Sequence, residues 1–445
     1  MDRWPGTDEM VEWIRTVVAR GIRRPGYPAD TWTEQWAARM LRSFGLDVAR
    51  EPVAVPRWLP RSATLTVRSA DQQAAGCGEL TVEGFPLPFT APTRATTAPL
   101  VRLADAPAHP GALAVDELRL TELPQSYVRS LATSSYDPEG VFDTLVQTLP
   151  FGPRLNQVVE PALEAKAAGY VGALDFPWET RDYYVPYDAV ERPVPGLWLR
   201  PRDTRRVLAL MDKGPCTGTL TSSSRLTDAT SHNVVATLPG ASDHWVVIAS
   251  HHDAPWASAV EDGTGIALVL AAARHWSRVP RERRPHNLLF LLTAGHMAHA
   301  AGTRAFIETH RDLLPNVVLQ MHMEHAALRC VPEDGVLKPT ADPEVRWWFT
   351  TQEAPLERLV HESIAAERLR RSHVLKPDVF SPMPPTDGAF FHPEGVRLVH
   401  FLSAPMYLVD SADTLDKVDT EGLLPLSRAA ARIVEGTRGW APPTA

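Results

Sequence analysis

Imidazole and carboxylate side chains gather at the end of one predicted buried strand. The apolar run over residues 245–249 is followed by Ser-His-His-Asp at 250–253 and by an acidic turn, Glu-Asp-Gly-Thr-Gly, at 261–265. Ligands bind at the carboxyl ends of strands in open α/β sheets. Imidazole and carboxylate are ligands of zinc, which usually takes three protein ligands at a catalytic site. His251, Asp253 and the acidic turn therefore predict the first half of a metal site.

Two further predicted strands end in side chains of the same kinds. The strand over 287–292 is followed by a segment that contains His296 and His299, and the strand over 317–323 ends in Glu324 and His325. We expect these histidines, together with His251, His252 and His322, to lie near one edge of a sheet. A single histidine in such a place is more often structural, but histidine titrates near neutral pH. The group therefore predicts a candidate acid or base.

Strands and helices alternate through the C-terminal half, and this alternation is what would position the side chains. The pattern predicts an α/β fold with a mostly parallel (mixed) sheet and helices on both faces. Two one-sided helical patterns, over 10–18 and 32–44, precede it. The expected strands cover 233–238, 245–249, 287–292, 317–323 and 396–402, and the expected helices cover 265–275, 355–370 and 420–435.

The stretch from residue 233 to residue 265 resembles the zinc aminopeptidase family (peptidase family M-28). In that family a strand, His-x-Asp, a loop, Asp-Asn-Gly-Ser-Gly and a helix open the active site. His251, Asp253 and the turn at 261–265 stand at those places in this chain. The resemblance implies an aminopeptidase-like (phosphorylase/hydrolase-like) fold.

A second resemblance concerns the region between the first helices and the predicted sheet. Residues 164–173 resemble the core of a protease-associated domain, and residues 193–199, with a helix through 207–211, resemble the part that follows it. The implied organisation has N-terminal helices of the peptidase-like domain at 1–53, an inserted β-rich protease-associated-like domain at 54–228, and the rest of the peptidase-like domain at 229–445.

Family members hold two zinc ions, and a glutamate beside them takes a proton from the attacking water. The resemblance places the first ligand on His251 and the carboxylate that orients it on Asp253. The bridging carboxylate falls on Glu261, or on Asp262 if the alignment slips by one residue, and the later carboxylate falls on Glu324. One ion's ligands, an imidazole and two carboxylates, are thus retained in chemical type.

The positions of the other ligands carry different chemistry. His296 stands where the family has its general-base glutamate, Met297 where it has a ligand glutamate, and Val409 where it has the last ligand histidine. A thioether is a poor zinc ligand beside oxygen and imidazole donors, and valine has no donor atom. The resemblance therefore predicts a remodelled site and not an ordinary two-zinc aminopeptidase.

Further site residues follow from the same alignment. Asp387 lies in a segment that resembles the family's Ser-Asp-His-x-x-Phe loop. We predict catalytic roles for His296, Asp253 and His299, and substrate-binding roles for His325, Asp387 and Tyr407. Tyr183, Tyr184 and Tyr187 belong to a loop that can pack ordinarily or cover the substrate.

Three functional hypotheses remain open at this point. One is a mononuclear zinc hydrolase, or a related enzyme, that acts on an amide or amino-acid-like substrate. Another is a metal-free enzyme on the same scaffold that catalyses a cyclisation, an elimination or a hydrolysis. The last is a non-catalytic protein that binds a peptide or a partner. One zinc ion or no cofactor is compatible with the sequence.

Composition narrows the partners. The 445 residues carry a formal net charge of −8 that is spread along the chain, which argues against nucleic acid. The N-terminus lacks the pattern of a signal peptide, and no apolar run is long enough to span a membrane. Cys77, Cys216 and Cys330 are too scattered for a disulfide framework. We expect buried thiols in a cytoplasmic protein that acts on a small-molecule or peptide substrate.

Overall fold

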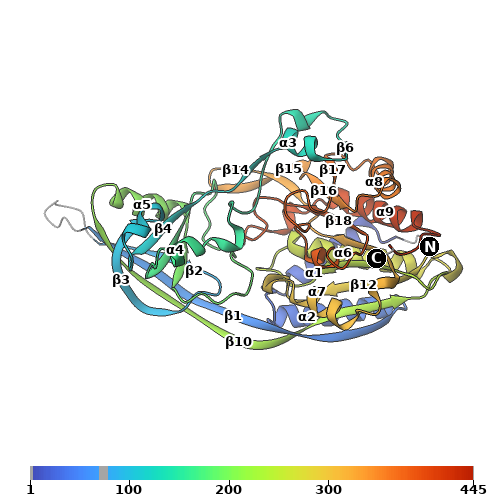
Figure 1. Ribbon diagram of the computed structural model, residues 1–445, viewed down its shortest axis with the longest axis horizontal. Coiled ribbons are helices and arrows are strands. Elements are labelled where there is room, and N and C mark those ends of the chain that lie inside the picture. Colours follow the sequence, from blue (N-terminus) through green and yellow to red (C-terminus); the bar gives the residue numbers. More distant parts are fainter. Residues whose placement is uncertain (1–3, 70–78, 444–445) are drawn as a thin grey trace.

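Two long strands run through the molecule and join its two parts. The computed structural model describes residues 4–69 and 79–443. Strands β1 (Asp47–Ser69) and β10 (Cys216–Leu238) pair antiparallel over nearly their full length. Figure 1 shows them running side by side along the lower edge, from the part that contains β3 (Thr93–Arg102) and β4 (Leu113–Leu118) to the part that contains β12 (Asn287–Thr293).

The larger part is built around a mixed sheet. Strand β10 is followed in this sheet by β12, β11, β13, β18, β16, β17 and β6. The four strands from β12 to β18 are mutually parallel, and antiparallel pairs stand on either side of them. Their bounds are β11 (Trp245–His251), β12 (Asn287–Thr293), β13 (Val317–Met323), β16 (Arg346–Thr350), β17 (Ser372–Leu375), β18 (Leu398–Ser403) and β6 (Ser134–Tyr136). The predicted mixed sheet with a parallel centre is confirmed.

Helices cover both faces of this sheet, which explains why its central strands are apolar almost throughout. On one face, α1 (Thr7–Val18), α2 (Pro28–Ser43), α6 (Gly265–Ser277) and α9 (Thr420–Gly436) enclose the largest hydrophobic cluster. Helix α8 (Ala354–Ala366) packs beside α9. On the other face, Phe306 and Ile307 of α7 (Ala301–Thr309) pack on residues of β10, β11 and β12.

The smaller part is β-rich. Five strands connect β1 back to β10 in the order β2, β9, β8, β4 and β3, so that the pairing of β1 with β10 closes the ring. The elements are β2 (Leu80–Pro86), β3 (Thr93–Arg102), β4 (Leu113–Leu118), α4 (Glu160–Glu164), β8 (Gly169–Leu174), β9 (Gly196–Leu199) and α5 (Pro201–Met211). The predicted domain boundaries at 53 and 228 fall inside β1 and β10. The assignment as a protease-associated domain stays a prediction.

One segment of the chain leaves the β-rich part and returns to the central sheet. It contains β5 (Glu122–Pro124), α3 (Gln125–Leu131), β6 and β7 (Val146–Thr148). Strand β6 pairs with β17 at the outer edge of the sheet. Figure 1 shows α3 and β6 beside β17, far from β3 and β4. Residues 150, 151, 155 and 156, just beyond this segment, line a pocket together with residues that follow the central strands β11 and β13.

Most predicted elements are present, and the differences have local causes. Helix α8 ends at Ala366 and not at residue 370, because Arg368 takes a left-handed backbone conformation with φ of 54°. A hairpin of β14 (Leu328–Glu333) and β15 (Val336–Pro343) follows β13 and was not predicted. Cys216 and Cys330 are buried thiols, as expected, and Cys77 lies outside the described residues. Within 4–69 and 79–443, no helix is long and apolar enough to cross a bilayer.

Candidate functional site

Acidic and imidazole side chains meet at the carboxyl edge of the parallel strands. His251 ends β11, and Glu324 and His325 directly follow β13. The Nε2 atom of His251 lies 3.4 Å from Oε1 of Glu261, and the Nε2 atom of His325 lies 3.0 Å from its Oε2. All four residues are buried. The fold thus brings together side chains that are separated by more than seventy positions in the sequence.

Three imidazoles are oriented in the same way. The Nδ1 atoms of His251 and His325 each bond to a backbone carbonyl oxygen at 3.0 Å, that of Asp253 and that of Ser403. The Nδ1 atom of His296 bonds to a carboxylate oxygen at 3.1 Å. These oxygens only accept, so each Nδ1 carries the proton, and each Nε2 is left to face the centre. Histidine ligands of metals are commonly fixed in this manner.

The loop that carries Glu261 is held from two sides. The Asp413 carboxylate accepts hydrogen bonds from three consecutive backbone N–H groups, residues 259–261, at 3.1, 2.8 and 2.8 Å. The buried Arg23 guanidinium donates to the carbonyl oxygens of residues 257, 258 and 261 at 3.1, 2.8 and 3.2 Å. Neither residue was predicted to belong to the site. Arg23 lies shortly before a Pro-Gly pair at positions 25 and 26.

Glu324 is fixed by a buried string of polar side chains. Its Oε1 atom accepts from Nε2 of His322 at 2.7 Å and from the backbone N–H of Asp387 at 2.9 Å. Behind His322, the side chain of Gln320 bonds to it at 3.5 Å and also to His400, which in turn bonds to Thr386 at 2.7 Å. The Oε2 atom of Glu324 is left to face the centre, 3.9 Å from Nε2 of His325.

His296 and Asp387 form a second fixed pair. The Asp387 carboxylate also accepts hydrogen bonds from the hydroxyls of Thr293 and Thr303, so both of its oxygens are engaged. The His296 ring stacks on the ring of His251, with centroids 4.2 Å apart, and its Nε2 atom lies 3.7 Å from Oε1 of Glu261. The pair therefore places an imidazole nitrogen at the border of the cluster.

Burial lowers the pKa of all three histidines, but the groups around them shift the three pKa values in different directions. Burial lowers the pKa of His251 well below its ordinary value, and the nearby imidazoles lower it further. Burial alone would also lower the pKa of His296, but Asp387, Glu261 and Glu324 raise it to about 10. Glu261 has the same effect on His325 and raises its pKa to about 10. His251 is therefore neutral and presents a free lone pair.

The donor atoms form two sets that suit a metal ion. Within the described residues, the ligand atoms of His251, Glu324 and His325 lie within 4.8 Å of one another, and so do those of His251, Glu261 and His296. Each set has two imidazoles and one carboxylate, which is a ligand combination found at catalytic zinc. Buried polar atoms without partners are costly, and Nε2 of His251, Oε1 of Glu261 and Nε2 of His325 have no hydrogen-bond partner. A cation would satisfy them, so the residues fit a metal.

Asp262, the alternative to Glu261, is outside both sets. One of its oxygens accepts from the backbone N–H of Gly265 at 2.8 Å, and the other accepts from the hydroxyl of Ser250. Its Oδ1 atom also accepts from the backbone N–H of His325 at 3.3 Å, and its Oδ2 atom lies 3.8 Å from Nε2 of His251. Asp262 thus stabilises the start of α6, and Glu261 is the residue that faces the centre.

Three other predicted site residues lie around the cluster and not in it. The Asp253 carboxylate accepts from the backbone N–H groups of His296 and Met297 at 2.9 and 2.8 Å, and only its carbonyl oxygen holds His251. His299 is exposed and packs on Phe390 at the pocket border. The buried Tyr407 hydroxyl donates to two backbone carbonyls at 3.1 and 3.3 Å, so the predicted contact of Tyr407 with substrate finds no support.

A pocket of about 320 Å³ opens onto the cluster. Glu261, His296, Glu324, His325 and Asp387 line one side of it. The rest of the wall is largely apolar and comes from several segments, namely Phe151, Leu155, Met297, Trp347, Phe390, Leu402, Leu408 and Val409. Of the three loop tyrosines only Tyr187 lines the pocket, with its ring 5.7 Å from that of His296, whereas Tyr183 and Tyr184 are buried in the core.

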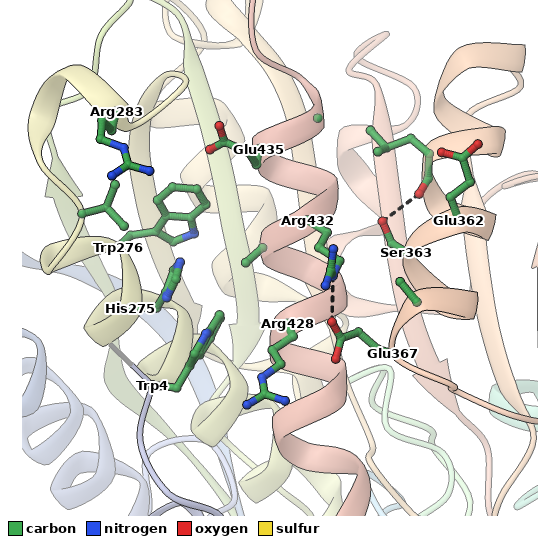
Figure 2. Close-up of a pocket in the computed structure, with 15 residues that line it drawn as sticks. Trp4, His275, Trp276, Arg283, Glu362, Ser363, Glu367, Arg428, Arg432 and Glu435 are labelled. Atoms are coloured by element: carbon green, nitrogen blue, oxygen red, sulfur yellow. Dashed lines mark hydrogen bonds and ion pairs between the residues drawn. The ribbon is translucent and has the colours of Figure 1, made fainter. Parts of the chain in front are cut away.

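A larger hollow, of about 810 Å³, lies elsewhere, between α6, α8 and α9 (Figure 2). Figure 2 shows the Trp4 ring beside that of His275, and their centroids are 3.9 Å apart. The Arg432 side chain in this hollow is already paired with Glu367 at 2.7 Å. Neither set of metal-ligating residues reaches it. The smaller pocket, which contacts both sets, is therefore the candidate site.

Comparisons with known proteins agree with the observed fold. Residues 233–434 match the model of Peptidase family M28. The fold is similar to that of a Peptidase M28 precursor from Shewanella amazonensis SB2B, with 18% identity and a TM-score of 0.69 over 98% of this chain and 94% of that chain. It is also similar to an aminopeptidase from Aneurinibacillus sp. strain AM-1, with 18% identity and a TM-score of 0.64 over 99% and 95% of the two chains.

A third similar structure is BSAP, a zinc aminopeptidase from Bacillus subtilis, with 14% identity and a TM-score of 0.64 over 99% of this chain and 96% of that chain. No curated protein matches the sequence. At these identities the solved structures show a shared fold. The resemblance to the zinc aminopeptidase family is confirmed.

Proposed function

We propose that this chain, whose residues 233–434 match Peptidase family M28, is a hydrolase that uses a single metal ion to cleave an amide bond. His251, Glu324 and His325 would hold the ion, most simply zinc. The observation that carries this proposal is the set of buried, unpartnered donor atoms. Nε2 of His251 and Nε2 of His325 both lack a hydrogen-bond partner, although both nitrogens lie beside carboxylate oxygens.

Both sets contain the same nitrogen atom, and this favours one bound ion over two. Each set needs Nε2 of His251, because its Nδ1 proton is engaged by the Asp253 carbonyl. An imidazole nitrogen has a single lone pair, so the two sets are alternatives. Met297 and Val409, which stand where the family has ligands for the other ion, line the pocket and offer no strong donor to zinc.

We favour His251, Glu324 and His325 as the metal ligands, because His296 is better placed to exchange protons with a bound substrate. The His296 side chain is 14% exposed and lines the pocket, whereas those of His251 and His325 are 0% and 5% exposed. Its Nδ1 is held by Asp387, so its Nε2 can exchange a proton with a bound substrate. The resemblance places this residue at the general-base position.

These residues suffice for the hydrolysis of an amide. When bound, zinc polarises a carbonyl group and lowers the pKa of water. A cation bound nearby would offset the charges of Glu261 and Glu324, which raise the pKa of His296. His296 would then accept a proton from the attacking water as the water oxygen bonds to the carbonyl carbon. The same imidazole then donates that proton to the nitrogen as the carbon–nitrogen bond breaks. Asp387 keeps the ring oriented and stabilises its protonated form throughout.

A metal-free enzyme is the second candidate, and a specific observation favours it. The pairs His325–Glu261 and His296–Asp387 are close enough to be ion pairs, and the pKa of each histidine is raised to about 10. A protonated His325 would satisfy Glu261 without a cation. The same cluster would then act only in proton transfer, for a cyclisation, an elimination or a hydrolysis.

Metal content distinguishes the two candidates. The chain is purified without a chelator or a histidine tag, loaded with zinc, desalted and measured by elemental mass spectrometry. We expect about one zinc per chain in the wild type and in His296→Ala, and a loss of zinc in His251→Ala and in His325→Ala. Retention by His325→Ala with loss by His296→Ala would select the other ligand set. No zinc in the wild type would support the metal-free enzyme.

A further inference from the structure

Among the residues that the structure describes, three hydroxyl side chains line the pocket, and two of them are already engaged. The Ser381 hydroxyl donates to a backbone carbonyl two residues further on, and the Thr386 hydroxyl pairs with Nδ1 of the buried His400 at 2.7 Å. The hydroxyl of Tyr187 has no hydrogen-bond partner in the described part of the chain, and the protein does not enclose it. Tyr187 therefore offers a free hydrogen-bond donor to a molecule in the pocket.

The other uncharged donors around the pocket are placed less well. The indole nitrogen of Trp347 has no partner either, but it is fully enclosed, so a molecule in the pocket does not reach it. His299 lies at the pocket border, where its ring packs on Phe390. The side-chain oxygen of Asn156 accepts the backbone N–H of Tyr187 at 2.8 Å, so Asn156 serves to hold the tyrosine. Tyr187 is the donor best placed to meet a substrate.

The protein fixes Tyr187 beside the candidate acid and base, His296. In addition to the hydrogen bond with Asn156, the carbonyl oxygen of Tyr187 accepts from the backbone N–H of His299 at 3.3 Å. The centroid of the Tyr187 ring lies 5.7 Å from that of the His296 ring. Both backbone groups of the tyrosine are thus anchored, and its hydroxyl needs little reorganisation to meet a bound molecule.

The hydroxyl keeps its proton at neutral pH. Burial raises the pKa of Tyr187 to about 13, and the negative charges of Glu261 and Glu324 contribute to this rise. Electrostatic interactions weaken with distance, so the influence of both glutamates indicates that the hydroxyl lies near the cluster. The group acts there as a hydrogen-bond donor and not as an anion.

We propose that the Tyr187 hydroxyl donates a hydrogen bond to the carbonyl oxygen of the bound amide and is a catalytic residue of this site. This inference rests on the proposed hydrolase function. In that function His296 carries a proton from the water to the leaving nitrogen, so its Nε2 atom does not serve the carbonyl oxygen. Negative charge develops on that oxygen during the reaction. Removal of one donor that is already in place there typically slows turnover by about 100- to 1,000-fold.

Tyr187 gives up no atom in this role. As the water oxygen bonds to the carbonyl carbon, one electron pair of the carbon–oxygen double bond moves onto the carbonyl oxygen, which accepts the hydrogen bond more strongly. The pair returns to form the double bond when the carbon–nitrogen bond breaks. The hydroxyl keeps its proton throughout, and water is the only co-reactant.

A binding measurement on the zinc-free protein tests the hydrogen bond independently of turnover. Leucinamide and its thioamide analogue, in which sulfur, a weaker acceptor, replaces the carbonyl oxygen, are titrated by NMR into the wild type and Tyr187→Phe. Phenylalanine keeps the ring and removes only the hydroxyl. We expect the variant to bind leucinamide about fivefold more weakly, which is typical of one lost hydrogen bond, and to bind the thioamide like the wild type. Equal changes for the two ligands, no change for either, or no binding of leucinamide to the wild type would overturn the inference.

Tyr184→Phe is the matched control. Tyr184 belongs to the same loop, but it is buried in the core and does not line the pocket. We expect this variant to bind both ligands like the wild type. A loss of leucinamide affinity as large as that of Tyr187→Phe would assign the effect to the packing of the loop and contradict the inference.

Hydrolysis separates this inference from the proposed function. We measure kcat and KM for leucine anilide with the zinc-loaded wild type, Tyr187→Phe and Tyr184→Phe. We expect Tyr187→Phe to lower kcat by about 100-fold or more with little change in KM, and Tyr184→Phe to behave like the wild type. Cleavage by the wild type with an unchanged kcat in Tyr187→Phe supports the hydrolase and overturns the inference. If the wild type does not cleave the anilide but Tyr187→Phe weakens only leucinamide binding, the hydrogen bond stands and amide hydrolysis is the proposal that fails.

Discussion

The Nε2 atom of His325 lies 3.0 Å from the Oε2 atom of Glu261, and both side chains are almost fully buried. The Nδ1 atom of His325 carries the ring's proton, because it bonds to the carbonyl oxygen of Ser403. A lone pair and a carboxylate oxygen repel one another at this distance unless the nitrogen holds a proton or binds a metal ion. We propose that His325 binds a metal ion in the catalytic state and carries a second proton when no metal is bound.

The first prediction concerns stability. A metal that binds only the folded chain stabilises it, by about 2.7 kcal/mol at a free concentration of one hundred times Kd. We expect zinc to raise the Tm of the wild type and EDTA to reverse the rise. His325→Ala should show no rise, whereas His299→Ala, which changes an exposed histidine at the pocket border, should keep it. A rise of equal size in His325→Ala would place the ion elsewhere.

The second prediction concerns the string of polar side chains behind Glu324. His322→Phe removes the 2.7 Å hydrogen bond that fixes the glutamate. We expect zinc affinity to fall by about 10- to 100-fold, which is typical when the partner of a ligand is lost. His400→Phe interrupts the string further from the glutamate and should have a smaller effect. Competition with a fluorescent zinc chelator measures both variants, and the opposite order of effects would contradict this role.

The third prediction concerns Arg23, which holds the loop of Glu261. Its buried guanidinium donates to the backbone carbonyls of residues 257, 258 and 261. Arg23→Met removes these hydrogen bonds, and a buried group that is left unsatisfied costs about 1–3 kcal/mol. We expect the free energy of unfolding in urea to fall by at least about 2 kcal/mol and zinc affinity to weaken. The matched variant Arg15→Met removes an exposed ion pair with Glu12 and should change stability by less than about 1 kcal/mol. Equal effects would refute the assignment.

The fourth prediction concerns pH. Burial raises the pKa of Glu344 from 4.5 to about 7 in the folded chain. The folded state therefore holds this proton more tightly than the unfolded state, so the stabilising contribution is complete below pH 4.5 and is lost as the pH rises through 7. Glu344→Gln cannot titrate. We expect the variant to gain about 3 kcal/mol on the wild type between pH 4 and pH 8, as measured by urea unfolding at each pH. A constant difference would contradict the shift.

The order of the elements could be predicted well, because apolar runs and turn residues alternate clearly after residue 233. The long strands β1 and β10 could not. Prolines at positions 52, 56 and 60 argue against a strand, yet β1 continues through them beside β10. The outer part of β10 is rich in serine and threonine and has no continuous apolar run. Pairing between these distant segments, and not local preference, stabilises both strands.

The candidate site was predicted in part. His251, Glu261 and Glu324 follow from their motif and from their places after strands, and the structure brings all three together. The choice between Glu261 and Asp262 could not be made from spacing, because it depends on which side chain contacts the start of α6. His325 was expected to bind substrate. Its backbone is left-handed, with φ of 58°, a local conformation that the sequence does not reveal, and its side chain belongs to one of the two candidate metal-ligand sets.

The most direct test of the central claim is anomalous diffraction at the zinc absorption edge from crystals of the zinc-loaded chain. The account predicts one strong peak, within bonding distance of Nε2 of His251, Nε2 of His325 and a Glu324 oxygen, with His296 still paired to Asp387. Two peaks in the cluster, or one peak bonded to His296, would contradict it. An absence of any peak, in a protein that still turns over its substrate, would assign the chemistry to the histidines and carboxylates alone.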